Sequence, residues 1–342
     1  MSALRPRGRA QAPVRVAVIG PTATGKSDLA LDLIETLGEG AGATVPAQVL
    51  NADASQLYRG MDIGTAKLPL SERRGVTHLQ LDVLSVRDEA SVAAYQRAAR
   101  NDLDALARCG ARAVIVGGSG LYVRAVTDAL DFPGTDPAVR AALTERAYQE
   151  GSRRLWEELR ASDPVSAERI DAADTRRIVR ALEVQAVTGR LFSASLPRYE
   201  DLAPTVHLAL RPERQALNAR IDQRARHMFA TGLLEETEAL IGQGLREGTT
   251  APRAIGYAQA LAVVDGTMSV EQAVQDTAAA TRRLASRQLK WFRRDPRVRW
   301  IDVDLAPDGT WREGERERVT ALAVRRVRER EQADGATSVG RT

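Results

Sequence analysis

The octapeptide GPTATGKS, residues 20–27, decides the fold of this chain. It fits the pattern G-x-x-x-x-G-K-[ST] and stands between a β-branched run at 14–19 and a helical pattern at 27–37, the context that a phosphate-binding loop requires. The glycines let the backbone wrap around oxyanions, and the positive end of the following helix favours negative charge. We expect Lys26 to neutralise the terminal phosphate and the Ser27 hydroxyl to ligate Mg²⁺. The loop predicts a phosphate site without saying which phosphate ester it holds.

Strands and helices alternate along the chain after this loop. Further strands are expected at 47–51 and 112–116, with a helix at 91–107 between them. Such alternation is typical of an α/β fold, here a P-loop core with a parallel sheet covered by helices.

The pattern changes at about residue 136. From there to residue 200 only helical periods occur, broken near Gly151, Asp163 and Asp171, which predicts an all-helical insert domain. The core then resumes over 201–305, with strands at 205–210 and 297–303 and helices around 213–230, 232–242, 252–265 and 270–294. We expect residues 1–13 to be disordered, 14–135 to form the first part of the core, and 306–342 to be a polar tail that is either a frayed helix or disordered.

Composition is typical of a soluble globular protein, with 44% hydrophobic and 27% charged residues. The sequence contains neither an apolar run of the roughly 18 residues that a membrane helix needs nor a signal peptide at its N-terminus. Its single cysteine, Cys109, excludes an internal disulfide and a cysteine-rich zinc site. We therefore expect a cytoplasmic monomer with no membrane partner.

Basic residues gather near the end of the core. Between Arg282 and Arg299 there are eight of them against one acid, Asp295. Such a cluster suits a phosphate backbone, since each neutralised phosphate releases a counterion. The alternative is an ordinary solvated helix face.

A polar, turn-rich segment follows the second expected strand. That strand would deliver Asp53 to the carboxyl edge of the sheet, where ligands of α/β proteins bind. A carboxylate beside a phosphate site can ligate Mg²⁺ or act as a general base. The residue pattern leaves both roles open, together with a third in which Asp53 only caps a turn.

Three motifs together resemble one family, the tRNA dimethylallyltransferases, also called tRNA isopentenyltransferases. They are GPTATGKS at 20–27, DASQLYRGMDIGTAK at 53–67 and GGSGLY at 117–122. Two positions depart from the family pattern, because Ala54 and Ser119 stand where serine and threonine are usual. The resemblance runs from Val16 to about Asp304, without the zinc finger of eukaryotic relatives.

The resemblance implies a donor site and a set of catalytic residues. In the family the loop binds the diphosphate of dimethylallyl diphosphate, a role that would fall on Gly20, Pro21, Thr22, Ala23, Thr24, Gly25, Lys26 and Ser27. Asp53 matches the general base that takes a proton from N6 of the target adenine. Ser119 matches a hydroxyl near the reacting centre, and Arg224 matches an arginine that clamps the leaving diphosphate. Arg220 and Arg224 are four residues apart and share one helix face.

The resemblance also implies contacts with the anticodon stem-loop of tRNA. The matching positions are Asp53, Ala54, Ser55, Gln56, Ser119, Arg140, Arg176, Arg177, Arg180, Arg253, Gly256 and Tyr257. Since aromatic residues make up only 4% of the chain, arginine planes are expected to supply much of the base stacking.

The expected reaction is transfer of a dimethylallyl group to N6 of adenosine 37, next to the anticodon. Three alternatives remain on the sequence alone. A P-loop kinase of a small metabolite shares the loop and the acid, and an isopentenyltransferase acting on free AMP shares the chemistry. The third is an RNA-binding module without activity, which has no use for an intact loop and acid.

Overall fold

The computed structural model describes residues 12–38, 46–130, 132–195 and 199–339. In these ranges six parallel strands form one sheet in the order β3-β2-β4-β1-β5-β6. The expected α/β fold with a parallel sheet is confirmed, and all the expected strands are present. The sequence analysis missed only β3, which has two residues. The strands are β1 (Arg15–Ile19), β2 (Ala47–Asn51), β3 (His78–Leu79), β4 (Arg112–Gly117), β5 (Thr205–Pro212) and β6 (Val298–Val303).

The register of the three central strands brings their carboxyl ends together. Ile19 of β1 pairs with Gly117 of β4, and Asn51 of β2 pairs with Val116. The approach is so close that a Cβ on Gly117 would lie 2.2 Å from the carbonyl oxygen of Ala52. The loops that follow these strands must therefore start side by side, which is where ligands of parallel sheets bind.

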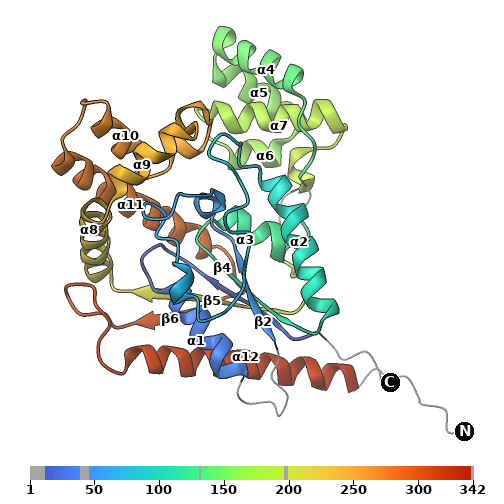
Figure 1. Cartoon of the computed structure of the whole chain (residues 1–342). Coiled ribbons are helices and arrows are strands. Elements are labelled where there is room, and N and C mark those ends of the chain that lie inside the picture. Colours follow the sequence, from blue (N-terminus) through green and yellow to red (C-terminus); the bar gives the residue numbers. More distant parts are fainter. Residues whose placement is uncertain (1–11, 39–45, 131, 196–198, 340–342) are drawn as a thin grey trace, which may run out of the picture. The chain divides into compact units, whose positions relative to one another are not determined.

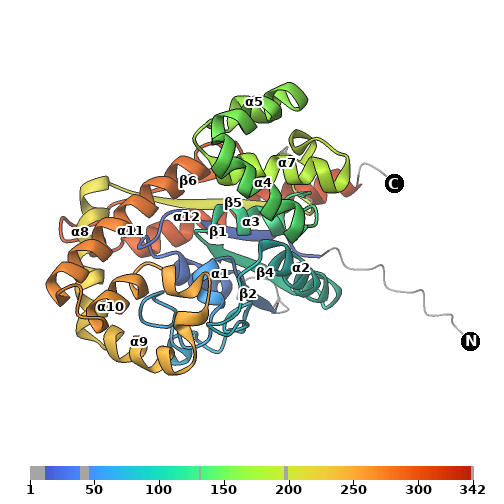
Figure 2. The same cartoon turned by 90° about the horizontal axis from the view of Figure 1, so that it is seen from above.

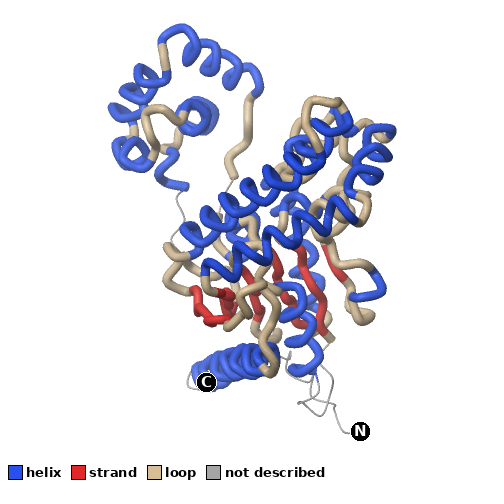
Figure 3. Tube along the Cα trace, turned by 90° about the vertical axis from the view of Figure 1, so that its left-hand side faces the viewer, coloured by secondary structure: helices blue, strands red, loops and turns tan. Residues whose placement is uncertain are grey.

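Helices lie on both faces of the sheet (Figure 3). On one face, α1 (Lys26–Gly38) and α12 (Glu315–Val339) pack into a core with the valines of the strands. Next to β4 lie α2 (Val92–Arg108) and α3 (Gly120–Thr127). Burial of these apolar side chains is the main contribution to the stability of the core.

Of the two alternatives for the polar tail after residue 306, disorder is wrong for most of that segment, because Glu315–Val339 forms a helix. Helix α12 runs along the sheet beneath α1 (Figure 1) and buries Val319, Ala323, Val324 and Val327. The remaining turns are so rich in charge that this narrow apolar stripe does not stand out in the sequence. Disorder was also predicted for residues 1–13, of which residues 1–11 lie outside the described residues.

Four further helices surround the open side of the P-loop core (Figure 2): α8 (Arg214–Ala230), α9 (Leu233–Gly242), α10 (Tyr257–Val264) and α11 (Val270–Phe292). They share a core with Tyr58, Met61 and Val86. The single helix expected at 252–265 is wrong, because Ala251–Arg253 forms a separate 3₁₀ turn and α10 begins only at Tyr257. Gly256, with φ of 94°, makes the change of direction possible.

Residues 128–200 form a second compact unit, which begins eight residues before the expected insert. It contains α4 (Pro137–Glu150), α5 (Ser152–Ser162), α6 (Pro164–Arg169) and α7 (Thr175–Thr188), followed by a 3₁₀ turn at Phe192–Ser195. The helices break where the sequence predicts. Side chains of Asp136, Asp163 and Asp174 cap α4, α6 and α7, which satisfies backbone N–H groups at their first turns.

None of the helices in the described part of the chain is both long and apolar enough to cross a membrane.

Candidate active site

The phosphate-binding loop joins β1 to α1, and its backbone is bent at three points. Gly20, Ala23 and Gly25 have positive φ angles of 118°, 62° and 85°. The carbonyl of Pro21 accepts hydrogen bonds from the Thr24 hydroxyl at 3.0 Å and from Lys26 Nζ at 2.5 Å. The loop is thus held in its curved form by its own side chains.

Asp53 and Ser119 come together from the ends of β2 and β4. Asp53 begins a 3₁₀ turn (Ala54–Leu57), and its Oδ1 accepts a hydrogen bond from the backbone N–H of Ser55 at 3.0 Å. The Ser119 hydroxyl accepts from the backbone N–H of Ala54 at 3.2 Å. The turn and the third motif are therefore tied to each other, and the Asp53 carboxylate is fixed in direction.

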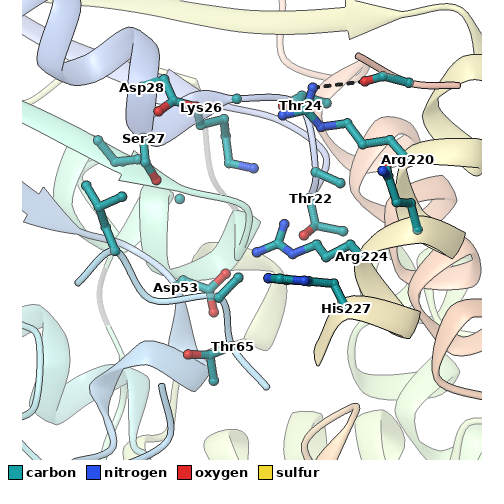
Figure 4. A pocket seen from close by; sticks show the side chains of 18 of the residues that line it. Thr22, Thr24, Lys26, Ser27, Asp28, Asp53, Thr65, Arg220, Arg224 and His227 are labelled. Atoms are coloured by element: carbon teal, nitrogen blue, oxygen red, sulfur yellow. Dashed lines mark hydrogen bonds between the residues drawn. The ribbon is translucent and has the colours of Figure 1, made fainter. Parts of the chain in front are cut away.

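One face of α8 supplies the opposite wall. Arg220, Gln223, Arg224 and His227 follow one another at the i, i+3, i+4, i+7 spacing of a helix face, and all four line the same cavity. Figure 4 shows Arg224 and His227 pointing toward Asp53 across this cavity. His227 is a site residue that the sequence analysis missed, although its spacing from Arg224 was a usable signal.

The cations of the site, Lys26, Arg220 and Arg224, are half-buried, and none of them forms an ion pair with a described residue. Burial lowers the pKa of Lys26 to about 8, and the charge of Arg224 adds to the lowering while Asp53 opposes it. Burial also lowers the pKa of Arg224 to about 10, assisted by Arg220. Both positive charges are therefore costly in this site unless an anion joins them.

These groups surround a cavity of about 650 Å³. Of the predicted loop residues, Thr22 to Ser27 line it, whereas Gly20 and Pro21 lie behind it. Asp53, Gln56 and Thr65 form one wall, and the α8 face forms another. A third wall comes from Gly309, Thr310 and Trp311, a segment that the sequence analysis assigned to the polar tail.

A second cavity of about 470 Å³ adjoins the first. The two share Thr22, Asp53, Thr65 and Arg224 as lining residues. Its remaining lining is mostly apolar and includes Leu121, Tyr122, Ile221, Met228, Ile255, Leu284 and Trp291. Asp53 and Arg224 therefore stand at the boundary between a polar and an apolar compartment.

Gln288 on α11 ties the loop to the end of β4. Its Oε1 accepts from the Thr22 N–H at 2.8 Å, and its Nε2 donates to the Gly118 carbonyl at 3.0 Å. The side chain is buried, so the bond to Gly118 is shielded from water, whereas the bond to Thr22 is only partly shielded. No pattern near Thr22 or Gln288 predicts this contact, because the two residues are 266 positions apart in the chain.

Comparison with known proteins shows which family the chain belongs to. A family model described as IPP transferase matches residues 56–295, more than half of the chain. A tRNA dimethylallyltransferase of Kocuria rhizophila is 50% identical over 312 residues, which are 91% of this chain and 94% of the relative. The chain belongs to this family.

Further relatives agree with the assignment. A tRNA dimethylallyltransferase of Mycobacterium tuberculosis is 50% identical, covering 85% of this chain and 93% of the relative. The crystal structure of the tRNA isopentenylpyrophosphate transferase of Bacillus halodurans is 30% identical with a TM-score of 0.66, covering 94% of this chain and 99% of that one. A eukaryotic dimethylallyltransferase acting on tRNA, 22% identical with a TM-score of 0.71 over 85% of this chain and 74% of its own, shares the fold. The resemblance to tRNA dimethylallyltransferases, the fold and the class of enzyme expected from the sequence are confirmed.

Part of the second motif of this IPP transferase supports the site rather than lining it. Lys67 is buried, and its Nζ donates to Asp62 and Asp82, each at 2.6 Å, and to the Tyr58 carbonyl. Glu236 accepts from the backbone N–H groups of Asp62, Ile63 and Gly64. These contacts hold the 58–67 loop in place, and with it Thr65, which lines the cavity.

Tyr257, expected to contact tRNA, is fully buried beneath that loop. Its hydroxyl donates to Glu236 at 2.5 Å, and burial together with Glu236 raises its pKa, which keeps the donor protonated. In this fold the Tyr257 side chain supports the loop instead of facing RNA. Gly256 is also buried, whereas Arg253 is exposed.

The predicted tRNA residues of the helical unit fall into two groups. Arg140 and Arg180 both bind the buried carboxylate of Glu183, at 2.8 and 2.9 Å. Although burial alone would raise it, these hydrogen bonds hold the pKa of Glu183 below its usual value. Arg176 and Arg177 are exposed on α7. Arg140 and Arg180 therefore help to stabilise the helical unit through Glu183.

The basic cluster at 282–299 is not one surface. Arg282 is paired with Asp222, and Arg297 is held by Asp295 and Asp201 at 2.7 and 2.8 Å. Three exposed residues remain at helical spacing on α11, and none of them forms an ion pair with a described residue. We call Arg283, Arg287 and Lys290 the basic triplet.

Proposed function

We propose that this IPP transferase moves a dimethylallyl group from dimethylallyl diphosphate to N6 of an adenine in tRNA, at adenosine 37 next to the anticodon. The observation that carries the proposal is the position of Asp53 and Arg224 at the boundary of two cavities, one lined by the phosphate loop and one largely apolar. A transferase needs such a boundary, because its two substrates must meet at one reacting atom.

The polar cavity suits the diphosphate. Lys26, Arg220 and Arg224 line it, and the lowered pKa values of Lys26 and Arg224 indicate cations that lack a counter-charge. A diphosphate supplies that charge, and the backbone N–H groups of the loop and the start of α1 add to its stabilisation. Burial makes each of these interactions stronger than it would be in water.

The apolar cavity suits the flat adenine ring and the isoprenoid carbons. Tyr122, Met228 and Trp291 provide apolar and aromatic surface on which a base extruded from the anticodon loop can stack. Because Asp53 also lines this cavity, the exocyclic amine can reach its carboxylate. The basic triplet lies on α11, which also lines the apolar cavity. Arg287 is a member of the triplet and a lining residue of that cavity.

The reaction forms a bond between adenine N6 and C1 of the donor and breaks the bond between C1 and the diphosphate oxygen. The N6 proton passes to Asp53, and the bonding electrons leave with the diphosphate. N6 is a weak nucleophile, so proton removal and positioning by the site must make up for it. Lys26 and Arg224 stabilise the negative charge that develops on the leaving group.

Mg²⁺ fits the site as a companion of the diphosphate. This ion commonly binds through one or two protein oxygens together with phosphate oxygens and water. Ser27 and Asp28 line the cavity beside Lys26 (Figure 4), and the described residues contain no cluster of three or more His, Cys, Asp or Glu that would hold a metal alone. The Ser27 hydroxyl would be its protein ligand, and the ion would neutralise charge on the leaving diphosphate.

One labelling experiment tests the proposal. Dimethylallyl diphosphate labelled at C1 is incubated with the enzyme and either an unmodified tRNA carrying adenosine 37, the same transcript with guanosine there, or AMP. We expect label only on the first tRNA. Label on AMP would support an AMP-specific transferase instead, and phosphorylation of a small acceptor by ATP without prenyl transfer would support a kinase.

A further inference from the structure

We infer that the loop between β6 and α12, residues 304–312, is a working part of the donor site and that the indole N–H of Trp311 binds the diphosphate. The inference rests on the proposed diphosphate site. Residues 305–312 lie beyond Asp304, at about which the resemblance to the family pattern ends.

Trp311 lies against the phosphate-binding loop itself. A Cβ on Gly25 would stand 2.7 Å from Cζ2 of the indole, 3.4 Å from Cε2 and 3.5 Å from Nε1. The edge of the ring that carries the N–H therefore faces the loop. Since Gly25 immediately precedes Lys26, this edge lies beside the group expected to meet the terminal phosphate.

The Trp311 N–H has no acceptor among the described residues, although its residue lines the cavity. Trp156 shows the usual alternative, because its indole N–H donates to the carbonyls of Ala167 and Ile170. An indole N–H at the wall of an anion site is available as a hydrogen-bond donor to a phosphate oxygen.

The loop also positions Arg220. The Gly309 carbonyl accepts a hydrogen bond from Arg220 Nη1 at 3.1 Å, drawn as the dashed line in Figure 4. Gly309 has φ of 87°, and a Cβ there would lie 2.8 Å from the Arg220 backbone nitrogen. Backbone of the loop thus rests directly on α8, and only glycine permits this approach.

Internal contacts make the loop a fixed wall. Leu305 pairs with Trp311 as an antiparallel bridge, and the Ala306 N–H donates to the Thr310 carbonyl at 2.8 Å. Leu305 is buried in the main core, and Trp311 packs against the same core. Trp311 is therefore held in place before any ligand arrives, which reduces the entropic cost of binding.

The test is the binding of inorganic diphosphate to Trp311→Phe, which keeps an aromatic ring next to Gly25 but removes the N–H together with part of the bulk of the indole. We expect affinity to fall about tenfold, the lower end for a hydrogen bond to a charged acceptor, with tRNA affinity unchanged. The matched control is Trp300→Phe, which alters the tryptophan that stacks on Arg211 outside both cavities. Its diphosphate affinity should equal that of the unaltered protein.

A spectroscopic measurement needs no folded variant to be informative. The chain has four tryptophans, so labelling with 5-fluorotryptophan gives four ¹⁹F resonances. Inorganic diphosphate should shift one of them, the one that Trp311→Phe removes; if that variant does not fold, the shifted resonance must survive each of Trp156→Phe, Trp291→Phe and Trp300→Phe.

The outcomes separate this inference from the proposed function. Diphosphate affinity of Trp311→Phe within twofold of the unaltered protein, or a Trp311 resonance that does not move, would overturn the inference while leaving prenyl transfer possible. Failure of label to reach tRNA together with a shifted Trp311 resonance would overturn the proposed reaction and leave the diphosphate contact standing.

Discussion

Replacing Gln288 by leucine tests whether the donor loop depends on a contact from the far end of the chain. Gln288 is the single side chain that accepts from the Thr22 N–H and donates to the Gly118 carbonyl. Leucine has a similar volume and can do neither. The substitution therefore removes both hydrogen bonds and leaves the helix and its packing largely intact.

The expected cost follows from the burial of the two partners. A buried polar group without a partner costs about 1–3 kcal/mol. Gly118 is buried and must bear most of this cost, whereas Thr22 is only half-buried and can recover part of its bond from water. We expect the free energy of unfolding to fall by about 2–4 kcal/mol.

Unfolding in urea, followed by circular dichroism, measures this loss, and calorimetry with inorganic diphosphate measures the state of the loop. Gln275→Leu is the matched control, since Gln275 is exposed on the same helix and should change stability by less than about 0.5 kcal/mol. Gln288→Glu adds a second comparison, because it keeps an acceptor for Thr22 but sets a carboxylate oxygen against the Gly118 carbonyl. We expect it to be at least as unstable as Gln288→Leu.

A Gln288→Leu protein that unfolds at the same urea concentration as the unaltered protein, and binds diphosphate equally well, would refute this reasoning. The loop would then be held by its internal bonds alone.

Three further predictions concern the chemistry. Asp53→Asn keeps the Oδ1 that caps the 3₁₀ turn but removes the base, so single-turnover transfer should fall about 10²–10⁴-fold with both substrates still bound; a near-normal rate would exclude Asp53 as the base. Because the pKa of Lys26 is about 8, its cation is mostly present at pH 7 and mostly lost at pH 9. Diphosphate affinity should therefore fall over that range, and binding at pH 9 should take up a proton; calorimetry in two buffers measures this, and Lys26→Met should show no such uptake. Changing the basic triplet to glutamine should reduce the slope of log K for tRNA against log salt by about 2, at about 0.7 for each single-strand phosphate contact, with Arg282→Gln, whose partner is Asp222, as the control; equal slopes would mean a solvated face.

The parts of the site that the sequence predicted are those whose chemistry is carried by a contiguous stretch. The loop at 20–27 has its strand, its glycines and its helix within one segment, and Asp53 follows the carboxyl end of a strand of the sheet as expected. Local geometry fixes such groups, so residue order is enough to place them. The same is true of the insert, whose helices are separated at Gly151 and at aspartates that cap the following helix.

The missed parts depend on contacts between distant segments. Gln288, Glu236 and Trp311 each act on a motif from which they are far removed in sequence, and none sits in a motif of its own. The packing of α12 against the core was missed for a related reason. Some of its charged residues form ion pairs with the rest of the core, such as Arg316 with Asp32 at 2.8 Å. A count of charges in the sequence does not reveal such pairs.

Ion pairs distinguish the arginines that stabilise the fold from the cations of the proposed donor site. Arg140 and Arg180 share Glu183, and Arg297 is held by two aspartates, so these positive charges are balanced within the chain. Lys26 and Arg220 instead donate to backbone carbonyls, and Arg224 forms no ion pair with any described residue. Keeping three cations together and unbalanced opposes folding, because like charges repel and buried charges are poorly solvated. A fold that retains this arrangement gains from it only when an anion binds, and the anion must carry enough charge to engage all three. A diphosphate meets that condition, whereas a single carboxylate or a neutral ligand does not.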